Sequence, residues 1–363
     1  MITLHIIGLF HTITSTEYSH CAFTMKVLRF GKMMMNYGYR VIEYSNEGSE
    51  SDAIHIPILS KEELYRLSRR VEFVGDNAVI GNSIWVIFDD RLVSRMKEYV
   101  KDGDIICYPF GNTHPSISTI FPKCFHVETG IGYPDTFCNL RIFESSAWMH
   151  YTYGRESSGG KNYNWVIPNY YDIDDWDISI ETGTYILYFG RITQCKGLDT
   201  VLEIAKRLDS LPDHVPKKII ICGQGDPTPY LYKNIEYRKP IYGRERSNLL
   251  GGAYCLLMPT LFIEPFGGSG VEGQLCGTPL LSSNYGAFIE TVIDGISGFR
   301  CNTLHDWLSS LERVIHLGRG KIAAISRERY SLETCGRMYD KVFKDIYNLQ
   351  HDGWYSEHSP SCI

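Results

Sequence analysis

Apolar residues along this chain gather in short uninterrupted runs, and segments whose apolar positions have helical spacing lie between them. Runs of about 4–8 apolar residues bounded by Gly, Pro, Asn or Asp are typical of strands buried on both faces of a parallel sheet. The predicted strands cover 4–10, 39–44, 84–88, 104–109, 124–128, 185–189, 218–222, 254–258 and 279–282. The predicted helices cover 23–37, 91–100, 199–208, 271–276, 304–317 and a long segment from 331 to about 349.

Strand and helix alternate in both halves of the chain, which is the order of doubly wound α/β domains. The 363 residues exceed what one hydrophobic core usually serves, so we expect two domains. The polar, acidic segment 170–177 precedes a fresh strand and marks the boundary. The sequence predicts an N-terminal Rossmann-like domain over 1–168 and a C-terminal one over 169–345. Residues 346–363 are expected to form a tail that packs back on the N-terminal domain.

The composition is that of an ordinary globular protein, with 44% apolar and 21% charged residues. A net charge of −6 offers no clustered basic face to nucleic acid. The 11 cysteines include no CxxC pair, which predicts free thiols in a reducing compartment and no metal site. No apolar stretch reaches the ~18 residues that span a bilayer, and the N-terminus has no signal-peptide pattern. We therefore expect a soluble cytoplasmic protein with no nucleic-acid partner and no transmembrane segment.

Two loops follow predicted strands of the second half, and the first of them is a candidate for binding an anion. The loop GRITQCKG at 190–197 projects Arg191 and Lys196 beyond the end of a strand, and both side chains bind phosphate oxygens well. Two solvated basic side chains are the simpler alternative. The loop GQGD at 223–226 begins with Gly223 and is more typical of a tight turn, although it could also lie near a nucleotide base.

A third loop, EPFGGSGVE at 264–272, combines two carboxylates with a glycine-rich turn that leads into a helix. The glycines bring backbone amides close to a ligand, and the start of a helix carries a partial positive charge. Carboxylates accept hydrogen bonds from vicinal hydroxyls, so Glu264 and Glu272 suit a sugar and a ribose. Taken one at a time, each glutamate has a simpler alternative. Glu264 would be a carboxylate that caps the helix, and Glu272 would be a solvated helix residue.

The two glutamates with seven residues between them, and Phe-Gly after the first, resemble the retaining GT-B glycosyltransferases of the fourth sequence family, also known as glycosyl transferases group 1. The similarity extends to YFGRITQCKG at 188–197, to CGTP at 276–279 and to GISGF at 295–299. VIPN at 166–169 resembles the segment that opens the second domain of these enzymes. The similarity is specific over about residues 164–300, and before them it is one of topology alone.

The resemblance implies a GT-B architecture, in which the acceptor-side and donor-side domains face each other across a cleft. It implies that Arg191 and Lys196 hold the donor diphosphate, that Glu264 contacts hydroxyls of the transferred sugar, and that Glu272 binds the ribose. It further implies that the segment 238–241 lies beside the base. The remaining residues that the resemblance places at the donor are Phe266, Gly267, Gly268, Ser269 and Ile241.

The first half departs more from the family pattern. Its first strand is followed by Gly8-Leu-Phe-His-Thr12, which has one glycine and still offers amides to phosphate. His126 and Glu128 stand near the end of the strand predicted at 124–128, a position that would let either contact the transferred sugar or the acceptor. A histidine at such a position is more often a satisfied structural residue.

By this resemblance the protein moves a hexose-type sugar from a GDP- or UDP-linked donor to a hydroxyl of a glycan, glycoconjugate or lipid-linked sugar. Retention of configuration is implied, and neither a metal nor another cofactor is expected. Asp172-Ile-Asp174 imitates a metal-binding DxD but falls in the predicted linker. The alternatives are a nucleotide-sugar epimerase on a similar fold and a non-catalytic nucleotide-sugar binding protein. A dehydrogenase would need GxGxxG after the first strand, where the chain reads GLFHTI.

Overall fold

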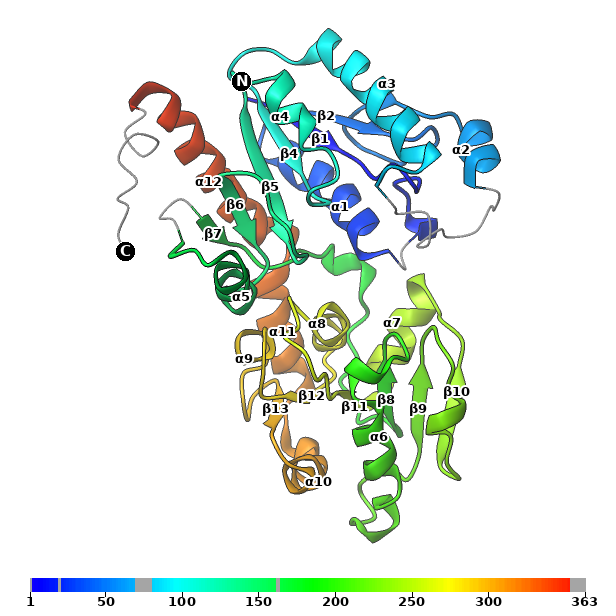
Figure 1. Cartoon of the computed structure of the whole chain (residues 1–363). Coiled ribbons are helices and arrows are strands. Elements are labelled where there is room, and N and C mark those ends of the chain that lie inside the picture. The colour runs from blue at the N-terminus through cyan, green and yellow to red at the C-terminus, as the bar shows by residue number, and fades with distance from the viewer. Residues whose placement is uncertain (1, 19–20, 69–79, 161–163, 353–363) are drawn as a thin grey trace. The chain divides into compact units, whose positions relative to one another are not determined.

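The computed structural model describes residues 2–18, 21–68, 80–160 and 164–352 (Figure 1). The chain divides into two compact units. Unit 1 comprises Met1–Glu144, Thr152–Tyr170 and Leu332–Ile363, and unit 2 comprises Ser145–Tyr151 and Tyr171–Ser331. The chain thus passes into its long unit 2 segment after Tyr170 and returns at Leu332, whereas the sequence suggested boundaries at 168 and 345.

Unit 1 is built on a parallel sheet whose strand order is β3-β2-β1-β4-β5-β6-β7. Its strands are β1 (Thr3–Ile7), β2 (Arg40–Ser45), β3 (Ile54–Pro57), β4 (Ile105–Tyr108), β5 (Phe125–Ile131), β6 (Leu140–Phe143) and β7 (Asn164–Val166). Its helices include α1 (Ala22–Asn36), α2 (Lys61–Ser68), α3 (Ser83–Tyr99), α4 (Ser116–Ile120), the last part of α5 (Ser146–Glu156) and α12 (Leu332–Asp352). One core lies around α1 and α12, and a second lies around α3.

The strand expected at 84–88 is wrong, because these residues begin helix α3. Asn82 caps the helix by accepting a hydrogen bond from the Trp85 amide at 2.8 Å. The buried positions Ile84, Phe88 and Leu92 then recur every four residues, which is the spacing of one helix face. A short apolar run alone does not separate a strand from a buried helix turn, since both bury consecutive residues.

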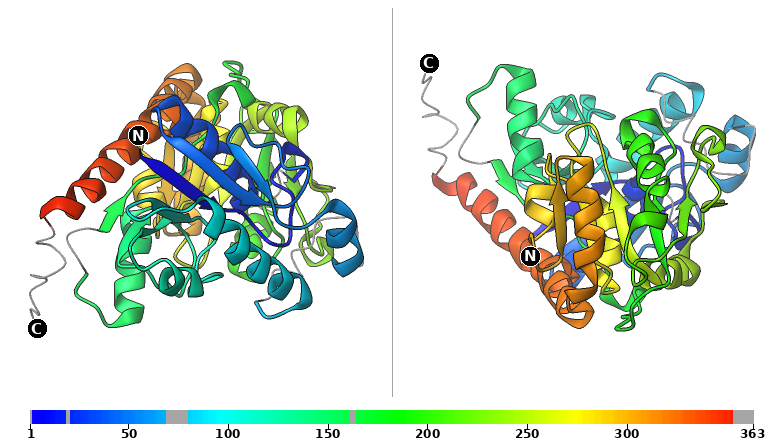
Figure 2. Two further views of the ribbon diagram at one scale, coloured as in Figure 1. Left: turned by 90° about the horizontal axis from the view of Figure 1, so that it is seen from above. Right: turned by 90° about the horizontal axis from the view of Figure 1, so that it is seen from below.

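Helix α12 belongs to unit 1 from its first turn. The Tyr37 hydroxyl at the end of α1 donates to the Glu333 carbonyl at 2.7 Å, and Phe343 packs edge-on against Phe30 at 6.2 Å between ring centroids. Ile346, at the start of the expected tail, is fully buried in the same core. Figure 2 shows α12 as one continuous helix. Residues 353–363 of the expected tail lie outside the described residues.

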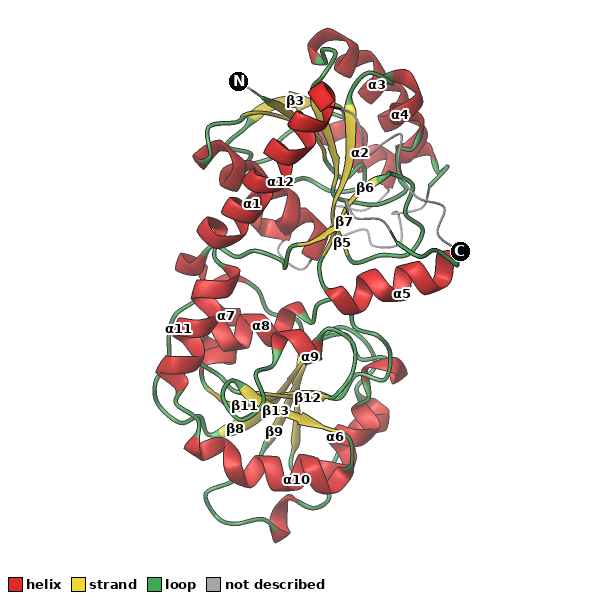
Figure 3. Ribbon diagram, turned by 90° about the vertical axis from the view of Figure 1, so that its left-hand side faces the viewer, coloured by secondary structure: helices red, strands yellow, loops and turns green. Residues whose placement is uncertain are grey.

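Unit 2 is built on a second parallel sheet, with strand order β10-β9-β8-β11-β12-β13. Its strands are β8 (Tyr185–Phe189), β9 (Ile219–Cys222), β10 (Ile235–Arg238), β11 (Ala253–Met258), β12 (Leu280–Ser283) and β13 (Gly298–Cys301). Its helices include α6 (Leu198–Ala205), α7 (Gly243–Gly251), α8 (Gly268–Leu275), α9 (Phe288–Thr291), α10 (Leu304–Arg313) and α11 (Arg319–Tyr330). Figure 3 shows α6 and α10 on one face of the sheet and α7, α8 and α11 on the other, so both faces are covered.

The strand order of unit 2 reverses between β8 and β11. In open parallel sheets, the loops at the carboxyl ends of the strands on either side of such a reversal enclose the ligand site. The loops concerned are 190–197 after β8, with Arg191 and Lys196, and 259–267 after β11, with Glu264. No helix among the described residues has both the length and the apolar character needed to cross a bilayer.

Candidate functional site

The loops after β8 and β11 meet in a pocket of about 120 Å³ within unit 2. Arg191, Lys196 and Glu264 line it together with Gly268 and Ser269 at the start of α8. The other lining residues are Tyr188, Phe189, Gly190, Met258 and Thr260. The structure therefore brings together, in one unit, both basic residues and the first glutamate of the sequence motif.

Lys196 and Glu264 form an ion pair across this pocket. The ammonium nitrogen of Lys196 lies 2.6 Å from Oε2 of Glu264, and their side chains are 15% and 12% exposed. The same nitrogen lies 4.7 Å from the ring centroid of Phe262. Such a pair gains from its low-dielectric surroundings, and it uses one of the three ammonium donors and one of the roughly four carboxylate acceptor sites.

Arg191 is the more accessible cation of the pocket. Its residue is exposed, and the described part of the chain supplies no ion pair to its guanidinium. Its backbone is fixed, because the Tyr188 hydroxyl donates to the Arg191 carbonyl at 2.6 Å. The loop therefore presents a fixed backbone and a guanidinium that remains open to an anion.

Close backbone contacts hold the two loops together. The Leu261 amide donates to the Cys195 carbonyl at 2.8 Å. Gly197 has φ of 74°, and a Cβ there would lie 1.9 Å from the Pro259 carbonyl oxygen. A side chain at residue 197 would push the loops apart, so this glycine is required by a close approach as well as by its backbone angle.

The turn before α8 exposes backbone amides to the pocket. Gly267 caps the helix with φ of 79°, and a Cβ there would lie 2.6 Å from the Phe288 ring. The Phe266 side chain points into the core instead, where it packs edge-on against Tyr330 at 5.7 Å between centroids. The first amides of a helix have no partner within the helix, so those of Gly268 and Ser269 suit an anionic ligand.

Glu264 itself stands on a fixed backbone. Its carbonyl accepts from the Ala287 amide at 3.0 Å, and the next carbonyl, of Pro265, accepts from the Ser145 hydroxyl at 2.6 Å. Ser145 precedes α5, whose first two amides, of Ser146 and Ala147, are bound by the Glu290 carboxylate of α9 at 2.9 and 2.8 Å. All of these contacts lie within unit 2.

Glu272 lies one turn into α8 and forms an ion pair with Arg246 of α7. The two side chains are 11% and 14% exposed, so this pair is as sheltered as that of Lys196 and Glu264. The Arg246 guanidinium carbon lies 4.8 Å from the ring centroid of Phe189, which lines the pocket. The sequence reading did not identify Arg246, because nothing in YGRERSN separates it from the neighbouring Arg244.

Gly223 and Ile241 mainly contact the backbone and the core of unit 2. A Cβ at Gly223 would lie 1.8 Å from the Gly190 carbonyl oxygen, and its amide lies 3.3 Å from the Arg238 carbonyl. This favours the turn reading for Gly223. Ile241 is partly buried and packs against the core cluster that contains Trp176.

Gly8 in unit 1 ends strand β1 with a contact to β2. Its amide donates to the Tyr44 carbonyl at 2.8 Å, and a Cβ there would lie 2.7 Å from Cβ of Ser45. The amide that was expected to meet a phosphate is thus already bound within the sheet. Glycine is required here because the two strands pass too close together for a side chain.

The placement expected for His126 is wrong, because β5 runs from Phe125 to Ile131 and His126 lies at its beginning. Its Nδ1 is 2.8 Å from the Tyr108 hydroxyl, and its Nε2 is 2.9 Å from the Phe121 carbonyl oxygen. Burial lowers the pKa of His126. These are the surroundings of a satisfied structural histidine.

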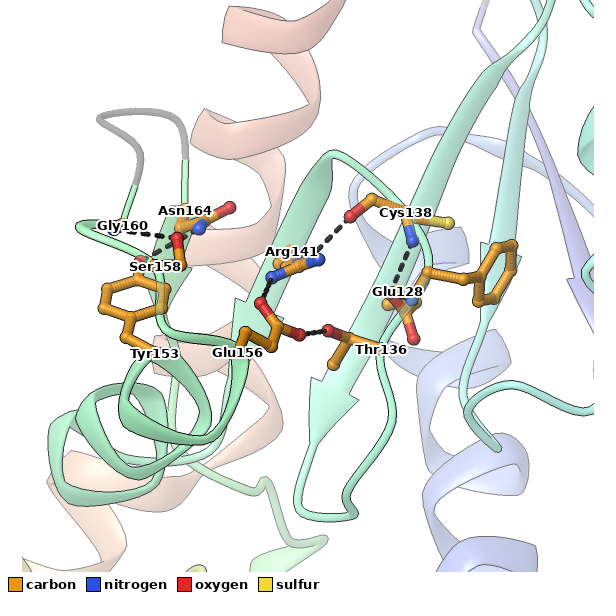
Figure 4. Close-up of polar contacts among 10 residues, drawn as sticks. Glu128, Thr136, Cys138, Arg141, Tyr153, Glu156, Ser158, Gly160 and Asn164 are labelled. Carbon is orange, nitrogen blue, oxygen red and sulfur yellow. Dashed lines mark hydrogen bonds and ion pairs between the residues drawn. The ribbon is translucent and has the colours of Figure 1, made fainter. Parts of the chain in front are cut away.

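Glu128 is a fully buried carboxylate in the middle of β5. Its Oε2 accepts from the amides of Phe137 and Cys138 at 3.0 and 2.8 Å, which holds the loop before β6 (Figure 4). Burial raises the pKa of Glu128 to about 7, against the opposing effect of these two hydrogen bonds. Figure 4 also shows Glu156 of α5 bridging Arg141 and Thr136 in the same region. Glu128 thus fixes the loop after its own strand.

Among the described residues, no group of three or more His, Cys, Asp or Glu is arranged to hold a metal ion. The Asp172 side chain of the DxD-like sequence lies 3.3 Å from the Asp174 amide and caps the short 3-10 helix η3 (Ile173–Asp175). It is therefore part of a local turn.

Comparison with known proteins agrees with this geometry. The family model "Glycosyl transferases group 1" matches residues 172–330, which is nearly all of the long segment of unit 2. This part of the chain is therefore similar to the glycosyl transferases group 1 family.

Curated relatives match parts of the chain. A D-inositol 3-phosphate glycosyltransferase of Paenarthrobacter aurescens is 29% identical over 141 residues, covering 35% of this chain and 34% of the relative. A lipopolysaccharide 1,2-N-acetylglucosaminetransferase of Salmonella typhimurium is 24% identical over 194 residues, covering 46% and 50%. The chain thus spans about a third to a half of the length of the curated relatives it matches.

Solved structures cover both units. AviGT4, a glycosyltransferase involved in avilamycin A biosynthesis, aligns with a TM-score of 0.68 at 13% identity over 96% of this chain and 98% of its own. Anabaena HepE, solved with UDP and glucose, aligns with a TM-score of 0.66 at 14% identity over 95% and 100%. These likenesses show the fold, and the predicted GT-B class is confirmed.

Proposed function

We propose that this protein is a glycosyltransferase that moves a hexose-type sugar from a nucleotide diphosphate sugar to an acceptor hydroxyl. The observation that carries the proposal is the pocket of unit 2 in which Arg191, Lys196, Glu264 and the first residues of α8 come together. Fixed cations and helix amides suit a diphosphate, and a carboxylate beside them suits sugar hydroxyls. The names of the relatives, which are glycosyltransferases, support the same reading.

A bound donor replaces the direct contact between Lys196 and Glu264. When the diphosphate enters, the flexible lysine turns its ammonium to a phosphate oxygen, and the glutamate accepts from hydroxyls of the sugar. Arg191 supplies a second cation to the diphosphate without losing an internal partner. Glu272, one turn further into α8, accepts from the ribose hydroxyls.

In the transfer step, the bond between the anomeric carbon and the diphosphate oxygen breaks while the bond to the acceptor oxygen forms. Negative charge grows on the departing diphosphate, and Arg191, Lys196 and the α8 amides stabilise it where it develops. The acceptor oxygen attacks from the face that the diphosphate leaves, which gives retention of configuration, and its proton passes to the departing phosphate oxygen. We propose that no metal or other cofactor takes part, and that the donor is linked to UDP or GDP. The acceptor is a glycan, glycoconjugate or lipid-linked sugar.

The test measures the melting temperature of the protein with UDP, GDP, ADP, CDP and the corresponding nucleoside monophosphates. Hydrolysis of a sugar donor linked to the nucleotide that binds best is then measured. A nucleoside diphosphate that binds the folded state alone raises the melting temperature in a concentration-dependent way. We expect UDP or GDP to do so and the monophosphates to do so less, because they lack one of the phosphates that Arg191 and Lys196 hold. No shift with any diphosphate would contradict the proposal.

A further inference from the structure

Beyond the proposed donor site, the structure places Arg246 against the one carboxylate that we assign to the ribose. We propose that Arg246 is a positioning residue that fixes the Glu272 carboxylate for a vicinal diol, and that the pair makes the site select ribonucleotides over 2′-deoxyribonucleotides. This inference rests on the proposed function of Glu272. It concerns a residue that is not among those lining the pocket and that acts through its neighbour.

The position of Glu272 on α8 ties it to the pocket. Gly268 and Ser269 line the pocket and precede Glu272 by four and three residues. Residues three and four apart share one face of a helix, so Glu272 continues the face whose first turn meets the ligand. Glu272 is 8% exposed, and a carboxylate this buried needs a partner that offsets its lost hydration.

Arg246 is that partner, and its guanidinium has little freedom to move. Its Nη2 contacts Oε2 of Glu272, and its guanidinium carbon lies 4.8 Å from the Phe189 centroid and 5.9 Å from the Trp176 centroid. A planar cation held over two aromatic rings gives a defined plane to the carboxylate that it binds. Phe189 is the last residue of β8 and lines the pocket, so the pair is anchored to the same strand end as Arg191.

The geometry of the pair leaves room for a ligand. Arg246 holds the carboxylate through one nitrogen, and its Nε is buried without a hydrogen-bond partner among the described residues. A carboxylate has about four acceptor sites, so the contact of Arg246 with Oε2 does not use them all. Two hydroxyls on adjacent carbons match an oriented carboxylate, whereas removing one of them leaves an acceptor of that carboxylate unpaired.

The simpler reading is that Arg246 only neutralises a buried charge. That role would weaken every nucleotide equally once Arg246 is lost, because the fold of the site would suffer as a whole. The positioning role instead changes the ratio between ribonucleotide and 2′-deoxyribonucleotide affinities. This ratio is therefore the readout that separates the two.

The experiment measures the dissociation constants of UDP, GDP and their 2′-deoxy counterparts by titration calorimetry. The wild-type chain should prefer the ribonucleotide by about tenfold, the strength of one hydrogen bond to a charged group. Arg246→Met should weaken ribonucleotide binding about tenfold and bring the ratio close to one, with Arg246→Lys in between. Arg244→Met is the matched control, because Arg244 lies on the same helix, pairs with Asp177 and has a side chain that is 66% exposed. Its ratio should equal that of the wild type.

A double variant tests whether Arg246 acts through Glu272. Adding Arg246→Met to Glu272→Gln should change the ratio no further than Glu272→Gln alone. An unchanged ratio in Arg246→Met, an equal loss for both nucleotides, or a wild-type chain without ribose preference would overturn the inference while the proposed function stands. If Arg246→Met fails to fold, Arg246→Lys decides, and a wild-type ratio in it overturns the inference. A wild-type chain that binds neither UDP nor GDP overturns the proposed function itself.

Discussion

The ammonium of Lys196 donates to the carboxylate of Glu264 at 2.6 Å, in a pocket where both side chains are more than four-fifths buried. The pair joins the loop after β8 to the loop after β11, the two strands between which the strand order reverses. Its two members are also the groups that we assign to the two halves of a donor, the diphosphate and the sugar. Binding and folding therefore make competing demands on the same pair.

Removing one member of this pair should destabilise unit 2. Lys196→Met leaves Glu264 buried without its cation, at a cost of about 3 kcal/mol in the free energy of unfolding. Lys196→Met combined with Glu264→Leu removes both charges and should recover most of that loss. Urea unfolding of the wild type, both single variants and the double variant measures the coupling. If the losses of unfolding free energy in the two single variants simply add in the double variant, the interaction between the two residues contributes nothing to stability.

Glu264→Gln should separate nucleotide binding from sugar transfer. The amide keeps the volume of the side chain but accepts from sugar hydroxyls less strongly than a carboxylate, so transfer should fall by at least about 100-fold. The dissociation constant of the nucleoside diphosphate should change little, since Arg191 and the α8 amides remain. Glu203→Gln is the control, because Glu203 of α6 pairs with Lys206 and its side chain is 41% exposed. Full transfer activity in Glu264→Gln would remove the role assigned to Glu264.

Ser145→Ala should slow transfer without unfolding the chain. The Ser145 hydroxyl donates to the Pro265 carbonyl at 2.6 Å, one residue after Glu264. Without this hydroxyl the backbone next to Glu264 is less restrained, so the carboxylate is less well oriented toward the sugar. We expect about a tenfold lower kcat with a nearly unchanged nucleotide affinity, because only the positioning of the sugar suffers. Ser118→Ala is a matched control, since Ser118 makes the same kind of bond to the Pro115 carbonyl at 2.7 Å within unit 1. Equal kcat values for the two variants would contradict the expectation.

The sequence predicted the central strands and the two loops that line the pocket well, and the reasons are physical. β8, β9, β11 and β12 are short runs buried on both faces, so their composition alone identifies them. The sequence motifs at 190–197 and 264–272 are local, and the glycines at 197 and 267 have positive φ there as such turns require. Strands β3, β6, β7, β10 and β13 were missed, because they have only three or four residues and carry partly exposed positions.

The partners of the motif residues could not be read from the sequence. Ser145 reaches Pro265 across 120 positions, and Arg246 reaches Glu272 from another helix. These contacts depend on how α5 and α7 pack, which no local pattern encodes. His126 was misplaced for a related reason: the apolar run that defines its strand gives no sign that the strand continues through Thr129 and Gly130 to Ile131.

The pH dependence of unit 1 should report the buried carboxyl group of Glu128. Its pKa is raised to about 7 by burial, above the ordinary value of 4.5, so the folded state binds this proton more tightly than the unfolded state. The stability contributed by the proton is present in full below pH 4.5 and is lost as the pH rises towards about 7. The shift corresponds to at most about 3 kcal/mol across this window.

Glu128→Gln removes the titrating group and should flatten this part of the profile. The amide oxygen still accepts from one of the Phe137 and Cys138 amides, which keeps the loop before β6 partly held. The measurement is the free energy of unfolding of the wild type minus that of the variant, by urea unfolding at intervals from pH 4.5 to pH 8. This difference should fall with rising pH and level off above about 7, because both states of the wild type are then ionised. A difference independent of pH would mean that Glu128 is already ionised throughout, with its two backbone hydrogen bonds outweighing its burial.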